Sequence, residues 1–314
     1  WGAAGQLPDE SRIFGHEYAP GITAGDDIFT VMSSDIFRGS AFALGYVNPD
    51  NLRGMNVWSD MYKVIRKANL MLARMDECQD MTALDRRNYT GYIHFLRGYA
   101  YYHILMTCGP AILVGDEIFE SNLDGPAYNT YRATYDETVE YICSELETAA
   151  AYLPLKASIA QFERPTKGAA YALIARLRLH AASPLFNGTS TARLYFGNWK
   201  RTYDKEYYIN QNYSEEKWAL AAAACKRVID MNVYELFTVS KDQNTPQLPA
   251  GVPTENFPNG AGGIDPFKSY SHMFTGDEPF KNNNEVIWGR ISEEVKGYTQ
   301  QSFPQYMGGY NGMG

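Results

Sequence analysis

Adjacent acidic residues are the closest approach to a catalytic arrangement in this chain. They occur as Asp26-Asp27, Asp116-Glu117 and Glu293-Glu294. Cleavage of a glycosidic bond needs two carboxylates that flank the bond, roughly 5 to 9.5 Å apart. Carboxylates from distant parts of a chain can meet in space, so a glycoside hydrolase stays open as an alternative. Carboxylates in loops are more often simply solvated, and we expect that here.

Other common catalytic motifs are absent from the sequence. His16 and Glu17 begin HEYAP rather than the H-E-x-x-H of zinc peptidases, and no G-x-S-x-G elbow occurs. The cysteines are scattered without a C-x-x-C pair, which predicts inert thiols at Cys78, Cys108, Cys143 and Cys225. We therefore expect no catalytic residues, no metal site and no cofactor, and we predict that the protein is not an enzyme.

The aromatic content points to binding. Tyrosine alone contributes 24 residues, and aromatic residues make up 14% of the chain. Tyr and Trp combine a flat apolar face with a polar group, which suits contact with sugars or peptides. The simpler interpretation is that many of these rings pack between helices.

Charge and hydropathy exclude some partners. A net charge of −8 argues against nucleic acid, which binds basic faces, and against attachment to anionic lipid. No window approaches the roughly 18 to 20 consecutive apolar residues of a membrane span. The N-terminal stretch shows no charged region followed by an apolar one, so no signal peptide is visible.

Two pairs of amphipathic helices and the start of a third are predicted from residue 57 onward. Apolar residues recur at three and four positions in 57–77 and again in about 82–107, which predicts an antiparallel pair. A second pair covers 134–153, ended by Pro154, and 165–183, ended by Pro184. Thr134 and Glu137 form a capping-box pattern. A third pair starts at Ser214, and its partner helix is not evident.

The connections between these pairs are long. The pairs begin about 80 residues apart, against about 34 for a standard tetratricopeptide repeat. Residues 1–56 and 233–314 show no sustained period, except that NEVIWGR at 284–290 resembles a strand. Long irregular connections in a compact domain usually carry function. We therefore predict an all-α scaffold of tetratricopeptide-like helix pairs with long irregular loops and little strand.

Three residues inside the helix patterns have structural interpretations. Asn69 interrupts an apolar stripe, and we expect it to bind the backbone of a loop. Arg97 is expected to pair with a carboxylate or a carbonyl under a loop. Trp58 opens a helix and is expected to anchor it.

Two of these segments resemble a known family. Trp58, Tyr62, Ile65, Ala68 and Asn69 form W-x3-Y-x2-I-x2-A-N, which is similar to the first paired helix of the SusD/RagB family. The segment FLRGYAYYHILMTCGPAILV is similar to the family's next helix and its Gly-Pro break, with Gly98 where Ala is usual. Further ordered matches extend the resemblance over about residues 57–290.

The resemblance implies a surface-exposed lipoprotein of the outer membrane. Such a protein captures glycans, or peptides in the RagB branch, and covers a SusC-like TonB-dependent transporter. We expect a single SusD-like domain over residues 1–314 that is incomplete at both ends. The family's lipidated Cys, its first helix and its C-terminal part are the expected missing elements. The helix pairs at about 57–231 would form the scaffold, and about 1–56 and 233–314 the binding face.

Ligand-contacting residues do not carry over by motif, because the binding loops of this family vary. Position and chemistry alone indicate candidates in two loops and one further segment. They are Tyr46, Asn48, Asn51 and Arg53; Tyr298, Tyr306 and Tyr310; and Trp199 in GNWKRTYDKEYY. A protein-binding helical scaffold without a small ligand is a further alternative.

Overall fold

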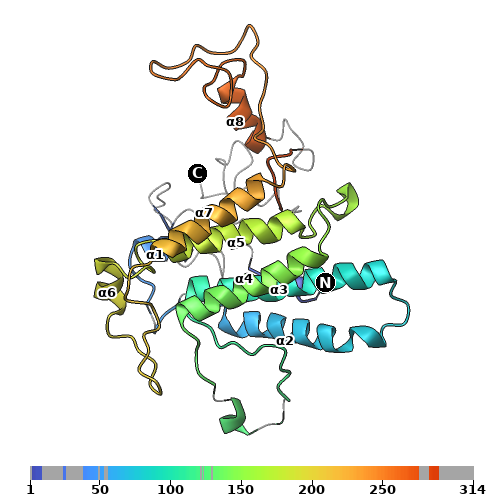
Figure 1. Ribbon diagram of the computed structural model, residues 1–314, viewed down its shortest axis with the longest axis vertical. Coiled ribbons are helices and arrows are strands. Elements are labelled where there is room, and N and C mark those ends of the chain that lie inside the picture. Colours follow the sequence, from blue (N-terminus) through green and yellow to red (C-terminus); the bar gives the residue numbers. More distant parts are fainter. Residues whose placement is uncertain are drawn as a thin grey trace, which may run out of the picture.

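The computed structural model is a stack of helices with long connections at its ends (Figure 1). It describes residues 2–8, 24–25, 38–48, 50–52, 56–120, 122, 124–128, 130–275 and 283–289. The described helices are α1 Arg38–Ala43, α2 Trp58–Arg74, α3 Ala83–Cys108, α4 Tyr135–Tyr152, α5 Lys167–Ala182, α6 Ser190–Phe196, α7 Glu215–Ile229 and α8 Pro266–Thr275. Short 3₁₀ turns occur at Ala4–Gln6, Met75–Glu77, Gly125–Tyr128 and Ile159–Gln161.

The predicted helix pairs are confirmed. Helix α2 packs on α3, α3 on α4, α4 on α5, and α5 on α7, so five helices follow one another through the stack. The partner that the sequence left open for the third pair is therefore α5, which lies before α7 in the chain. Within the described ranges, no helix combines the length and apolarity that a membrane span requires.

Side-chain caps define where the main helices begin. Thr82 and Thr134 each accept a hydrogen bond from the backbone N–H three residues on, and Asp85 and Glu137 complete the two capping boxes. Thr166 caps α5 in the same way through the N–H of Ala169. These caps satisfy N–H groups that the helices cannot pair internally.

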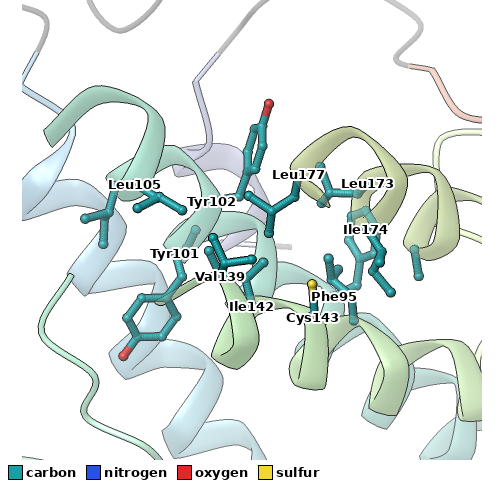
Figure 2. Packing of buried hydrophobic residues seen from close by; sticks show 14 of the residues in the cluster. Phe95, Tyr101, Tyr102, Leu105, Val139, Ile142, Cys143, Leu173, Ile174 and Leu177 are labelled. Carbon is teal, nitrogen blue, oxygen red and sulfur yellow. The ribbon is translucent and has the colours of Figure 1, made fainter. Parts of the chain in front are cut away.

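The core lies between α3, α4 and α5 (Figure 2). Phe95 and Tyr101 from α3, Ile142 from α4 and Leu177 from α5 are fully buried there. Complete burial of one such side chain stabilises the fold by about 1.5 to 3 kcal/mol. Much of the tyrosine content of α3 is thus core packing, as the simpler interpretation of the aromatic residues expected.

A buried polar network ties α2, α3 and α4 to the loop at 115–117. The Asn69 amide donates to the carbonyls of Gly115 and Glu117, both at 2.9 Å. Arg97 donates to Glu145 at 2.7 and 2.8 Å, to Asn69 at 2.8 Å and to Asp116 at 2.5 Å. The expectations for Asn69 and Arg97 are confirmed.

Helix α3 ends where the sequence shows Cys108-Gly109-Pro110. Gly109 has φ 76°, a left-handed conformation that favours glycine, and its N–H still bonds the carbonyl of Leu105. Trp58 lies half-buried nearby, with its ring under the guanidinium of Arg132 at 4.5 Å. Arg132 in turn donates to the carbonyl of Cys108 at 2.9 Å, so Trp58 anchors the start of α2 as expected.

The prediction of a strand at NEVIWGR is wrong for the residues described. Residues 283–289 form a turn and an irregular segment, because no strand among the described residues supplies the backbone partners that a sheet needs. Trp288 packs edge-on against Phe95 of α3 at 5.0 Å, and its indole N–H donates to the carbonyl of Glu163. The connections also contain α6 and α8, which the sequence analysis treated as irregular.

Candidate ligand-binding groove

A polar groove runs along the N-terminal half of α4. Its volume is about 1150 Å³, and the segment at 206–212 forms the opposite wall. The lining residues are Leu113, Thr134, Asp136, Glu137, Glu140, Tyr141, Ser144, Glu206, Tyr207, Asn210, Gln211 and Asn212. The lining residues come from Leu113 after α3, from the first turns of α4 with its cap, and from the connection between α6 and α7.

Helical spacing brings the α4 residues together. Glu137, Glu140, Tyr141 and Ser144 lie three and four positions apart, so they share one face of the helix. The opposite wall is held against α4 by the N–H of Tyr135, which donates to the carbonyl of Tyr208 at 2.8 Å. Ile209 is buried in the core and fixes the same segment.

Cations that are less exposed than their partners hold the carboxylates of the groove. Arg201 donates to Glu137 at 2.9 Å and pairs with Glu206 and Asp204. Arg178 pairs with Glu140 in a two-bond arrangement, with the second bond at 2.7 Å. Lys217 lies 2.6 Å from Asp136. Such pairs orient the carboxylates as fixed hydrogen-bond acceptors.

Two residues that line the groove each have a buried polar atom without a hydrogen-bond partner among the described residues. These atoms are the hydroxyl of Tyr141 and Oε1 of Gln211. Burial, with a smaller effect of Glu145, raises the pKa of the Tyr141 hydroxyl, so this group keeps its proton and can donate. A buried polar atom without a partner costs about 1 to 3 kcal/mol.

An exposed tyrosine pair stands beside the groove. Tyr131 and Tyr203 are 62% and 52% exposed, and their ring centroids are 4.4 Å apart. The guanidinium of Arg201 lies 5.2 Å from the Tyr203 ring while it also binds Glu137. One buried arginine therefore links the aromatic pair to the acidic wall.

Trp199 is the predicted ligand residue that lies nearest to this arrangement in the chain. Its N–H donates to the carbonyl of Phe196, and its own carbonyl accepts from the N–H of Tyr208, which belongs to the groove wall. The indole also packs at Gly109, where an added Cβ would come 3.4 Å from the ring. Trp199 therefore supports the groove wall, and at 36% exposed it keeps part of its ring accessible.

The other described candidates form a turn of their own. Asn48 and Asn51 exchange backbone hydrogen bonds, and the Asn48 side chain accepts from the N–H groups of Asp50 and Asn51. Tyr46 precedes this turn and is exposed. The remaining candidates, Arg53, Tyr298, Tyr306 and Tyr310, lie outside the described residues, and so do Asp26-Asp27 and Glu293-Glu294.

Sequence reasoning missed most of the groove. It singled out Trp199 but passed over the residues that follow in the same connection, Tyr203, Glu206, Tyr207 and the amide run Asn210-Gln211-Asn212. A run of amides after several tyrosines, between two helices, was the available signal. The α4 contribution had no comparable signal, because exposed acidic residues are common on helix surfaces.

Comparisons with known proteins agree with the fold. Paired helices with a loop-built groove define a tetratricopeptide-like binding scaffold. Residues 27–179 match a family model described as "Starch-binding associating with outer membrane". No curated protein sequence matches the chain significantly. Over these residues the chain is similar to the SusD-like family, and its helical fold agrees with that similarity.

Solved structures share the architecture at low identity. A SusD-like protein from Bacteroides fragilis is 18% identical with a TM-score of 0.60, over 93% of this chain and 43% of that one. A structure titled as a SusD-like carbohydrate binding protein from the same organism is 16% identical with a TM-score of 0.52, over 84% of this chain and 38% of that one. The chain thus spans less than half the length of these structures.

Proposed function

We propose that the protein captures oligosaccharides in the α4 groove. The observation that carries this proposal is that two residues lining the groove, Tyr141 and Gln211, each have a buried polar atom that meets no partner within the described residues. The family description names starch binding, and one structural relative is titled a carbohydrate binding protein. Both names support a carbohydrate ligand over other small polar molecules.

The groove offers the two kinds of contact that a sugar chain uses. Its carboxylates and amides accept hydrogen bonds from hydroxyl groups, and each net hydrogen bond contributes about 0.5 to 1.5 kcal/mol. Tyr131 and Tyr203 offer flat apolar area for the C–H face of a ring. Tyrosine has only two side-chain torsions, so ordering it on binding costs little. Several such contacts give an affinity in the micromolar range or weaker after ordering costs.

Capture would be one step of uptake at the cell surface. The family description places its members in association with the outer membrane, and we propose that this chain is part of a surface lipoprotein. Its cargo would pass to a SusC-like TonB-dependent transporter. The helix stack would provide the scaffold for that assembly, and the loop-built end would contact the ligand. We further propose that the protein binds its ligand and does not cleave it.

A glycan and peptide array with purified protein tests the class of ligand. The proposal expects oligosaccharide binding, and binding of peptides alone would instead support the RagB-like alternative. Binding to neither, together with capture of a partner protein, would support a helical scaffold without a small ligand. Calorimetric titration then tests the site with the best glycan from the array.

Tyr141→Phe removes the hydroxyl that has no partner. We expect affinity to fall about five- to tenfold, which corresponds to one hydrogen bond, with no loss of thermal stability. The matched control is Tyr62→Phe, because the Tyr62 hydroxyl donates to the Ile112 carbonyl at 2.9 Å and accepts from its N–H at 2.8 Å. This control should lower stability and leave affinity unchanged. Unchanged affinity in Tyr141→Phe would remove the groove as the site.

A further inference from the structure

In the arginine ion pairs of the groove, the carboxylate is more exposed to solvent than the arginine that binds it. The side chains of Glu137, Glu140 and Glu206 are 50%, 62% and 58% exposed. Their partners Arg201 and Arg178 are only 7% and 15% exposed. The cations therefore lie behind the carboxylates, and the side that a ligand meets first is negative.

The side-chain amide of Gln211 likewise leaves an acceptor, and not a donor, without a partner among the described residues. Its NH₂ group donates to the carbonyl of Ile209 at 2.7 Å, so the donor end is used within the wall. Its Oε1, which only accepts, is the buried atom without a partner among the described residues. Carboxylate and amide oxygens thus give the groove several acceptors, among them negatively charged carboxylates, beside the hydroxyl and amide groups of the lining that can also donate.

A set of acceptors distinguishes ligands by their charge and by their donors. Hydroxyl groups donate to carboxylate oxygens without a change in the charge of either group. A uronate or sulfate ester brings its own negative charge to about 4 Å from an exposed carboxylate. Like charges repel at that distance, and the repulsion is stronger near a protein surface than in bulk water. The buried guanidinium groups lie farther from the ligand and compensate only part of it.

We propose that the groove selects glycans without acidic groups, whose hydroxyls donate into the acceptors, and that it excludes uronate- and sulfate-bearing chains. This inference rests on the proposed function, because it names the class of glycan that the same groove takes. The residues that decide the selection are Glu137, Glu140 and Glu206. Each is held in place by a buried arginine, so none can turn away from an acidic ligand without breaking its ion pair.

Matched oligosaccharide pairs test the selection directly. Each pair shares a backbone and differs only by a carboxylate in place of the C6 hydroxymethyl group, or by a sulfate ester. We expect the neutral member to bind at least tenfold more tightly at low salt. Added salt should narrow the difference, because screening weakens repulsion between exposed charges. Equal or tighter binding of the acidic members would overturn this inference alone.

Two variants locate the effect in the groove. Glu206→Gln removes one exposed charge, while Glu137 remains on Arg201, and it should raise the acidic-to-neutral affinity ratio about threefold or more. The control is Glu147→Gln, because Glu147 lies on the same helix and pairs with Arg227 but does not line the groove. A ratio that does not change in Glu206→Gln would overturn the assignment. Failure of every glycan to bind would instead overturn the proposed function, and this inference with it.

Discussion

At the scale of single residues, the tyrosine pair beside the groove combines exposure with a fixed position. Tyr203 is held between the Tyr131 ring and the guanidinium of Arg201, yet about half of it remains accessible. Exposed aromatic area that costs little to order suits a sugar ring. Arg201 also pairs with Glu137 and Glu206, so one side chain connects the tyrosine pair to two carboxylates of the groove.

Replacement of Tyr203 by alanine should weaken ligand binding with little effect on the fold. Loss of one stacking surface is worth roughly 1 to 2 kcal/mol at about 25 cal/mol per Å², which corresponds to about tenfold in affinity. Calorimetric titration and a melting curve on the same variant separate the two effects. The control is Tyr195→Ala, because Tyr195 on α6 is also exposed, at 69%, but its ring lies beside Phe196 rather than beside Tyr131 and Arg201. A fall in melting temperature without a change in affinity would assign Tyr203 a packing role.

His103 should make the stability of the protein depend on pH. It is 4% exposed on α3, and burial, with a smaller effect of Arg176, lowers its pKa to about 4. Below the ordinary pKa of 6.5 the unfolded chain takes up a proton that the native state refuses until about pH 4. The free energy of unfolding should therefore decrease as pH falls from 6.5 to 4, by up to about 3 kcal/mol.

Urea unfolding at pH 7, 6 and 5 measures how the free energy of unfolding changes with pH. Burial also lowers the pKa of His180, so the decrease in the wild type should exceed the share of His103 alone. In His103→Leu the free energy of unfolding should depend less steeply on pH, because the contribution of His103 is lost. Constant stability of the wild type between pH 6.5 and 5 would contradict the prediction.

At the scale of elements, the Arg97 network determines how α2, α3 and α4 meet. The guanidinium is 3% exposed, and Glu145 of α4 is 9% exposed. Although burial alone would raise the pKa of Glu145, hydrogen bonds from His94 and Arg97 keep it below its ordinary value. Glu145 is thus a buried charge that depends on its partners.

Arg97→Met should lower the free energy of unfolding by about 3 to 5 kcal/mol, because it leaves the Glu145 carboxylate buried without its main partner. The double variant Arg97→Met with Glu145→Leu should recover part of this loss. Chemical denaturation of the wild type, the single variant and the double variant measures their free energies of unfolding. The control is Arg74→Met, whose ion pair with Glu77 is solvent-exposed, and its stability should not change. A single variant as stable as the control would show that the network is dispensable.

At the scale of the whole molecule, the helix stack supports the long connections, and one helix of the stack, α4, forms a wall of the groove. Each groove carboxylate is paired with a cation, whereas a general acid must hold its proton near neutral pH. We therefore expect prolonged incubation with the bound glycan to leave it intact in a mass spectrum. Shorter products that disappear in Glu206→Gln would establish a hydrolase instead.

The sequence by itself determined the helices and several of their internal contacts. The recurrence of apolar residues and the capping pair at Thr134 and Glu137 depend on neighbours within one or two turns, and such short-range patterns can be predicted without a fold. Asn69 and Arg97 were predictable for a related reason. A polar side chain in an apolar stripe must find a partner, although the sequence does not name it.

Only the tertiary structure decided the groove. Its two walls, α4 and 206–212, are far apart in the chain, and their contact depends on how the connection between α6 and α7 folds back to the bond between Tyr135 and Tyr208. Dependence on distant segments also explains why the prediction of a strand at 284–290 is wrong, since a strand exists only where a neighbour supplies its hydrogen bonds. The packing of α7 on α5 likewise depends on contacts between distant segments, so the sequence did not reveal this partner. Long-range packing decides such contacts, because many arrangements satisfy the same local pattern of apolar and polar residues.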